Sequence, residues 1–317
     1  MSWGGFISWE GLSSPHANPP ASVPAYGRQA LACILRQERP EALYLPYYIC
    51  DSVYEAARFA EIPVKWYPIT QDFTPELSEI KSREMILVVD YFGLIPEQYL
   101  QSLTNKFGDR LILDLTHNWF ATPPKSIWAF SSTRKFFGVP DGSKIWIPTG
   151  KAFPLSATHN KPEYRHLLER IQGNPGEAYA LYSASEASIS CELQLQSHLT
   201  TAILKEVDYD SIQIRRKENF RLLSTALQPY NQLIIPSKFE STPFQYPFLP
   251  KAPLEHKALH QAGIFAPRLW AEVLTRNPEG YAFEKHLASN LLPLPVDQRY
   301  NQEDMHHMLE VLKGLML

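Results

Sequence analysis

The chain is organised around one stretch, Phe130-Ser131-Ser132-Thr133-Arg134-Lys135-Phe136-Phe137-Gly138-Val139-Pro140-Asp141-Gly142. Lys135 comes just after a short apolar run, hydroxyl residues precede it, and a Pro-Asp-Gly turn follows it. An amine held in such a place can form a Schiff base with an aldehyde. We predict this chemistry for Lys135, and the alternative is a surface lysine in a polar loop.

Apolar runs on both sides of this stretch have the composition of buried strands. They lie at 42–46, 63–67, 85–90, 110–114, 127–130 and 144–147. Helices are expected between them at 51–60 and 96–107. Strands that alternate with helices predict an α/β fold with a mostly parallel sheet.

Two polar side chains lie where predicted strands end. Asp114 closes the strand at 110–114, and Lys135 follows the strand at 127–130. Ligands of parallel α/β sheets bind at the carboxyl ends of the strands, so the pattern predicts that both residues lie on one rim. The alternative for Asp114 is a helix N-cap.

The sequence Tyr26-Gly27-Arg28-Gln29-Ala30-Leu31 has a glycine before a helix-period apolar run. It predicts a helix start, whose free backbone N–H groups favour an anion. The alternative is an ordinary helix N-terminus without a ligand.

The second half of the chain is predicted to be mainly helical. Helices are expected at 161–172, 185–206, 210–227, 254–262 and 302–315, and an extended segment at 291–295. On the helix at 210–227 we expect Arg215, Arg216, Lys217 and Glu218 to form a solvated face. We predict a large domain at 1–205, whose N-terminal arm packs through Trp3, Phe6 and Trp9, and a smaller α/β domain at 206–317.

Composition excludes several classes of function. The chain has 317 residues, 44% of them hydrophobic, and a net charge of -3, which gives no basic footprint for nucleic acid or membrane. Three separated cysteines without a CxxC motif fit a reducing cytosol, and neither a signal peptide nor a membrane-spanning run is visible. No P-loop or dinucleotide motif occurs. His256 and His260 are four residues apart, but a helix surface is expected there rather than a metal site.

The order of several motifs resembles the DegT/DnrJ/EryC1/StrS aminotransferases, which are fold-type-I pyridoxal-phosphate enzymes that act on sugars. The similarity runs from about Tyr26 to Leu312. It is carried by Tyr-Gly-Arg-Gln-Ala-Leu at 26–31, the segments at 45–53, 90–93 and 113–117, the lysine loop at 131–142, Gly-Ile-Phe-Ala-Pro-Arg-Leu-Trp at 263–270, and the segment at 294–300. The resemblance implies a three-layer αβα large domain and a smaller C-terminal α/β domain.

The resemblance also implies roles for individual residues. Lys135 would hold pyridoxal 5'-phosphate and move a proton, and Asp114 would pair with the pyridine nitrogen. His117 would lie near the phenolic oxygen, although a buried histidine satisfied by backbone is the alternative. Residues expected at the phosphate are Gly27, Arg28 and Ser132, with Ser131 as the fallback if the register differs by one. Tyr48 is the candidate for stacking on the cofactor ring.

This resemblance predicts a cytoplasmic transferase that moves an amino group, with glutamate as donor, to a keto-sugar or sugar nucleotide. A homodimer with its active site near the interface is expected. The family's Asn-Tyr-Arg motif, which reaches the neighbouring subunit's cofactor, has no clear match between 150 and 200. Two alternatives stay open: another pyridoxal-phosphate reaction, such as dehydration or racemisation, and a non-catalytic binding or regulatory member of the family.

Overall fold

The computed structural model describes residues 23–316 except 78, 155, 237–239 and 278. The predicted N-terminal arm with Trp3, Phe6 and Trp9 therefore lies outside the described residues. Among the described helices, none combines the length and the apolar character needed to cross a membrane.

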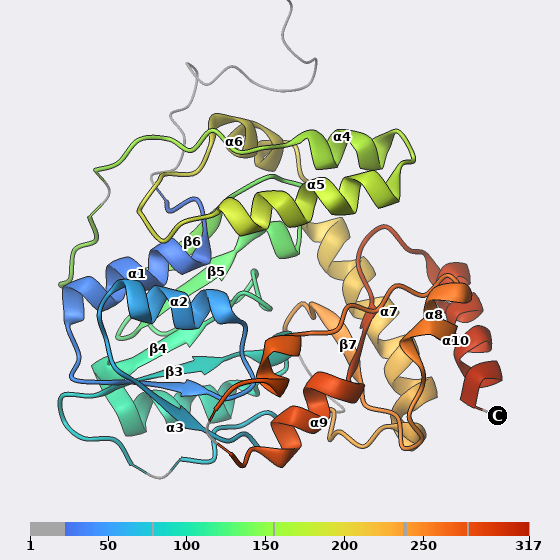
Figure 1. Cartoon of the computed structure of the whole chain (residues 1–317), viewed down its shortest axis with the longest axis horizontal. Coiled ribbons are helices and arrows are strands. Elements are labelled where there is room, and N and C mark those ends of the chain that lie inside the picture. Colours follow the sequence, from blue (N-terminus) through green and yellow to red (C-terminus); the bar gives the residue numbers. More distant parts are fainter. Residues whose placement is uncertain (1–22, 78, 155, 237–239, 278, 317) are drawn as a thin grey trace, which may run out of the picture.

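A six-stranded sheet forms the centre of the larger part of the molecule (Figure 1). Its strands run in the spatial order β2-β1-β3-β4-β5-β6, and β6 alone is antiparallel to its neighbour. Their bounds are Leu43–Pro46 (β1), Val64–Tyr67 (β2), Met85–Val89 (β3), Leu111–Asp114 (β4), Trp128–Ser132 (β5) and Ser143–Trp146 (β6). The predicted α/β fold with a mostly parallel sheet is confirmed.

Helices on both faces bury the sheet. Side chains alternate across a strand, so Asp114 of β4 faces the side of α1 and α2, whereas Leu113 and Leu115 face α3. These helices are Gly27–Glu38 (α1), Asp51–Phe59 (α2) and Glu97–Phe107 (α3), and short 3-10 helices lie at Tyr91–Gly93, Gly108–Arg110 and Thr133–Lys135. Because β3 and β4 are buried along their whole length, their sequences are continuous apolar runs.

A two-stranded antiparallel sheet lies in the C-terminal part of the chain, where β7 (Gln245–Phe248) pairs with β8 (Leu292–Pro295). The helices there are Tyr209–Leu227 (α7), His256–Gln261 (α8), Ala282–Asn290 (α9) and Gln302–Met316 (α10), with 3-10 helices at Gln228–Tyr230 and Ala271–Leu274. α7 packs against β7 and α10. A continuous apolar core joins this part to the large sheet, and the division at residue 205 remains our proposal.

The single helix predicted at 185–206 was wrong. The chain forms α4 (Arg165–Ile171) and α5 (Pro175–Ser188), and α6 begins only at His198 and ends at Lys205. Between α5 and α6, Leu195 bridges to Pro24 and His159. These backbone contacts, together with the Ser197 cap that accepts from the Thr200 N–H, are tertiary interactions that override helix propensity.

The solvated face predicted on 210–227 was wrong for Arg216, which is only 2% exposed. Backbone carbonyls of Pro243 and Phe244 accept hydrogen bonds from its guanidinium. A buried guanidinium needs such acceptors, and they come from a segment distant in sequence.

A buried carboxylate anchors the turn after the lysine. Asp141 accepts hydrogen bonds from the Ser197 N–H at 2.9 Å, from the Ser197 hydroxyl at 2.8 Å and from Asn160 Nδ2 at 3.0 Å, and Thr200 also donates to it. The next residue, Gly142, has a φ of +111°, and a Cβ there would lie 3.0 Å from Thr133 Oγ1. The turn therefore needs a glycine and is tied to the start of α6.

Replacing Asp141 with alanine should destabilise the protein by roughly 3 kcal/mol, because several buried donors lose a charged acceptor. Urea unfolding of Asp141→Ala against wild type measures this loss. Asp109→Ala, at an exposed aspartate, is the control and should change stability by less than about 0.5 kcal/mol. Equal stabilities of the two variants would contradict the anchoring role.

Candidate active site

A pocket of about 620 Å³ opens at the carboxyl ends of the parallel strands. Its wall is built from the starts of α1 and α2, the ends of β4 and β5, the 3-10 turn at Thr133–Lys135, the end of α5 and the segment around Trp270. Lys135 and Asp114 both line this pocket. The structure therefore brings the two residues together on one rim, as the strand pattern predicts.

Lys135 is half-buried in the short 3-10 turn that follows β5. In the described part of the chain, its amine has neither a hydrogen-bond acceptor nor an ion-pair partner. The Lys135 Nζ lies 5.2 Å from the centroid of the Phe244 ring. The amine is thus held against an aromatic face, beside the pocket and available to a ligand.

Asp114 is a buried carboxylate that both the backbone and the side chain of Thr116 contact by hydrogen bonds. Burial raises its pKa to about 6, although a hydrogen bond from the Thr116 N–H at 2.8 Å and the charge of Lys135 oppose the shift. The ionised form would therefore be stabilised by a further cationic donor in the pocket. A protonated ring nitrogen is a donor of that kind.

His117 lies next to the site but does not line the pocket. Its ring is fully buried, stacks on Phe244 at 4.5 Å and is nearly parallel to Trp270 at 5.9 Å. Nδ1 accepts the Phe92 N–H at 3.3 Å, so a neutral ring carries its proton on Nε2, which has no hydrogen-bond partner among the described residues. Burial and the charge of Lys135 hold the pKa of His117 well below its usual value. The residue is therefore a neutral N–H donor that has no acceptor in the part of the chain that the structure describes.

The start of α1 fits an anion. Tyr26 precedes the helix without a side-chain cap, and the first turn contains no acidic residue. In the described structure the backbone N–H groups of Gly27 and Arg28 have no acceptor. A Cβ on Gly27 would make an ordinary van der Waals contact with the Phe130 ring at 3.4 Å, so the helix starts close to β5. The Arg28 guanidinium donates to Ile189 O at 3.0 Å and forms an ion pair with Glu55 at 3.4 Å. Its described partners are therefore these two groups.

The two serines before the lysine point in opposite directions. Ser132 lines the pocket, whereas Ser131 is buried and donates its hydroxyl to Leu115 O at 2.7 Å. Alternation along β5 explains this difference. Ser132 is therefore the residue available to a ligand, and Ser131 is a structural residue.

The structure does not support the stacking role expected for Tyr48. The Tyr48 ring is fully buried between Trp270, at 4.6 Å, and Tyr91, at 6.0 Å, and it does not line the pocket. The chain turns into α2 after this residue, so Ile49 and Cys50 reach the wall instead. The Cys50 thiol lies 2.8 Å from Ser52 Oγ, and burial raises its pKa.

Several residues of the wall were not predicted. Arg134, beside the lysine, forms an ion pair with Glu186 of α5 and lies between the rings of Tyr26 and Tyr182. No sequence motif indicated this pair, because its members lie 52 residues apart.

The segment after Trp270 closes the opposite wall. Glu272 accepts the Asp51 N–H at 3.0 Å, and Arg276 donates to Ile49 O at 2.6 Å and to Tyr47 O at 2.8 Å. Trp270 is the last residue of a motif that the resemblance had marked, whereas Glu272 carried no signal. The C-terminal part of the chain is thus fixed to the start of α2.

A second pocket, of about 800 Å³, lies on the α3 side of the sheet. Buried Asp90 and Asn118 line it, and no lysine, histidine or cysteine is among its described residues. The smaller pocket is therefore the one equipped for amine chemistry.

The raised pKa of Asp114 predicts a specific pH dependence. Between the ordinary aspartate pKa of 3.8 and the raised value of about 6, Asp114 stays protonated in the folded state but ionises in the unfolded chain. A rise in pH through this range therefore lowers the free energy of unfolding. Asp114→Asn has no such titration. Its stability relative to wild type should increase between pH 4 and pH 7 by up to about 3 kcal/mol, measured by urea unfolding without added cofactor. A difference that does not change with pH would contradict the raised pKa.

Replacing Tyr48 with phenylalanine tests the place of that residue. The Tyr48 hydroxyl is buried and has no hydrogen-bond partner among residues 23–316 as far as they are described. Tyr48→Phe should therefore leave stability unchanged or raise it by about 1 kcal/mol. Ligand binding at the pocket should also be unchanged. Thermal unfolding and a binding titration measure both, and a large loss of binding would return Tyr48 to the site.

The chain resembles known proteins in its fold rather than in its sequence. The sequence matches no protein-family model and no curated protein. A sugar aminotransferase from Micromonospora echinospora has a TM-score of 0.64 at 13% identity over 95% of this chain and 89% of that chain. A DegT/DnrJ/EryC1/StrS aminotransferase from Brucella abortus has a TM-score of 0.62 at 14% identity over 92% and 84%. A Streptococcus pneumoniae protein solved in its PLP form has a TM-score of 0.62 at 16% identity over 91% and 84%.

These identities are too low to transfer residue roles, but the coverage is nearly complete in both directions. The structural neighbours include a member of the family that the sequence motifs resemble. The chain has the fold of the DegT/DnrJ/EryC1/StrS sugar aminotransferases.

Proposed function

We propose that the protein is a pyridoxal-phosphate-dependent aminotransferase. The observation that carries this proposal is the pocket itself. Three features converge from distant segments on the fold of sugar aminotransferases: a lysine amine, a buried carboxylate and a helix start. In the described structure, the amine and the first N–H groups of that helix have no hydrogen-bond partner. A surface lysine would have none of these neighbours.

The unpartnered groups around the pocket fit this cofactor. The N–H groups of Gly27 and Arg28 and the Ser132 hydroxyl suit a phosphate. The buried Asp114 carboxylate suits a protonated ring nitrogen, and the free Nε2–H of His117 suits a phenolic oxygen nearby. Each group lacks in the described structure the partner that the cofactor would provide.

Pyridoxal phosphate, when bound, supplies an aldehyde for amines and a ring that withdraws electrons. Lys135 would bind it covalently and, once displaced by an amino donor, would move a proton as general base and acid. Asp114 would keep the ring nitrogen protonated. Trp270 and Glu272, which belong to the C-terminal part of the chain, would shield their side of the pocket from water.

We propose a keto-sugar or sugar nucleotide as the amino acceptor, because the structural neighbours include sugar aminotransferases. For the amino donor we propose glutamate, as the resemblance of the sequence motifs implies. The resemblance of the sequence motifs further implies a homodimer with the active site near its interface, which we include in the proposal. The Streptococcus protein of this fold was solved in PLP, PMP and apo forms, which supports the choice of cofactor.

Purified protein supplied with pyridoxal phosphate should develop the visible absorption band of a lysine Schiff base. Lys135→Ala should lose this band and more than about 100-fold of amino-transfer activity, because both the covalent attachment and the proton transfer depend on the amine. Lys125→Ala is the control, since Lys125 is exposed. A wild-type protein that stays colourless with the cofactor would overturn the proposal.

Addition of glutamate in a single turnover should bleach the band in proportion to the enzyme present and release an equal amount of 2-oxoglutarate. Loss of water or inversion of a substrate centre without this exchange would instead indicate dehydration or racemisation.

A further inference from the structure

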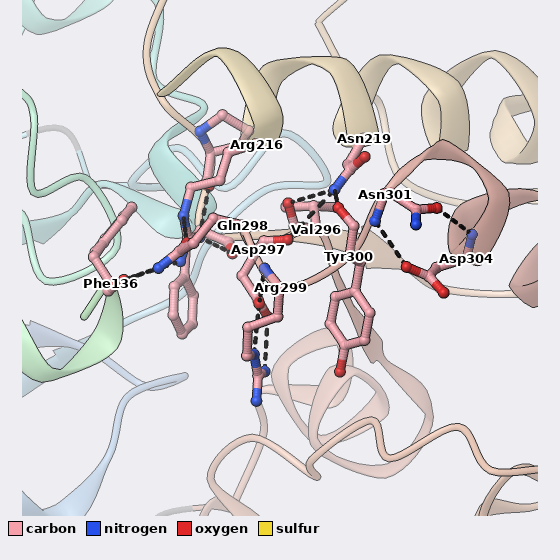
Figure 2. Close-up of polar contacts among 12 residues, drawn as sticks. Phe136, Arg216, Asn219, Val296, Asp297, Gln298, Arg299, Tyr300, Asn301 and Asp304 are labelled. Carbon is pink, nitrogen blue, oxygen red and sulfur yellow. Dashed lines mark hydrogen bonds and ion pairs between the residues drawn. The ribbon is translucent and has the colours of Figure 1, made fainter. Parts of the chain in front are cut away.

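The carbonyl next to the lysine is held by the C-terminal part of the chain. Phe136 follows Lys135, and its carbonyl accepts Gln298 Nε2 at 2.8 Å and, more weakly, Arg216 Nη2 at 3.5 Å. Figure 2 shows these side chains converging on Phe136 from α7 and from the segment after β8. The backbone at the lysine is thus fixed by side chains 80 and 162 residues away in sequence.

Arg216 is the centre of this arrangement. Its Nε donates to Gln298 Oε1 at 3.0 Å, and its guanidinium lies 4.5 Å from the centroid of the Phe136 ring. Asp297, the adjacent acid, is engaged by Arg299 at 2.7 and 2.8 Å (Figure 2). The acceptors of Arg216 in the described structure are therefore all neutral, and burial lowers its pKa to about 10.

The same guanidinium also holds the ring against which the lysine amine lies. Arg216 Nη1 donates to Phe244 O at 3.0 Å, and the Phe244 ring faces both Lys135 Nζ, at 5.2 Å, and His117, at 4.5 Å. One buried group thus fixes the residue after the lysine and the aromatic face beside its amine.

We propose that Arg216 and Gln298 are positioning residues for Lys135, and that they set the place of its amine in the pocket. The importance of this position for catalysis rests on the proposed function, but the placement of the amine can be measured without the cofactor. Lysine has a long flexible side chain, so its reach depends on where its backbone is held. A displacement of about 1 Å can cost a reacting group roughly 100-fold in rate.

Gln298→Glu separates positioning from folding. The carboxylate keeps an acceptor for Arg216 and adds an ion pair, so the melting temperature should not fall. It has no N–H for the Phe136 carbonyl and repels that oxygen instead. A purely structural role for Gln298 predicts a stable protein with an unchanged lysine.

The first measurement uses the protein without cofactor. Its lysines are labelled with a trace of an amine reagent, and mass spectrometry gives the rate at Lys135 relative to exposed Lys125. In Gln298→Glu this ratio should change by more than about threefold, since the amine moves relative to its pocket. A ratio within about twofold of wild type would overturn the proposal. This outcome does not depend on whether the protein binds pyridoxal phosphate.

The second measurement titrates pyridoxal phosphate and records the visible band. The dissociation constant in Gln298→Glu should rise about tenfold, as expected when one well-placed hydrogen bond is lost.

Arg216→Lys should change the labelling ratio in the same direction but by less, because an ammonium cannot donate to both the Phe136 and the Phe244 segments. Arg221→Met is the matched control, since Arg221 is an exposed arginine of the same helix. If the control and Gln298→Glu shift the labelling ratio equally, the positioning role is refuted.

Discussion

Parallel pairing of β3, β4 and β5 is the constraint on which the rest of the structure depends. The register places Asp114 opposite Val89 on one side and Phe130 on the other. Parallel strands end on the same edge of a sheet, so the carboxylate at the end of β4 and the lysine after β5 are brought to one rim. The helices then have to start at that rim, which exposes the first N–H groups of α1 to the same pocket.

Buried polar groups in the pocket and beside it have hydrogen-bonding needs that are only partly met within the described chain. The pKa of Asp114 is raised to about 6 by burial, and Nε2 of His117 has no partner. Groups of this kind cost stability unless a ligand pairs with them. Elsewhere in the molecule a buried carboxylate is fully satisfied, since Asp141 accepts from Ser197, Thr200 and Asn160. Asp114 is thus suited to bind a ligand, whereas Asp141 stabilises the fold.

The C-terminal part of the chain completes the site as well as packing beside it. Trp270 and Glu272 line the pocket, and Arg276 fixes their segment to the backbone before α2. On the other side of the lysine, Gln298 and Arg216 hold the Phe136 carbonyl. The segment around Trp270 and the backbone next to Lys135 are thus both held by residues that follow the large sheet in sequence.

The sequence by itself determined the α/β class with a mostly parallel sheet, the helix start at Gly27 and the candidate pair of Lys135 and Asp114. These features are local, because a buried parallel strand reads as an apolar run and a glycine before a periodic segment marks a helix. Only the tertiary structure decided that Arg216 is buried, that Tyr48 lies in the core while Cys50 reaches the pocket, and that the chain leaves helix geometry between 189 and 197. In each of these cases the deciding partner, such as the Phe244 carbonyl for Arg216 or Asp141 for the start of α6, is distant in sequence. Hydrogen bonds and packing between distant segments leave no periodic pattern, so they can be found only once the chain is folded.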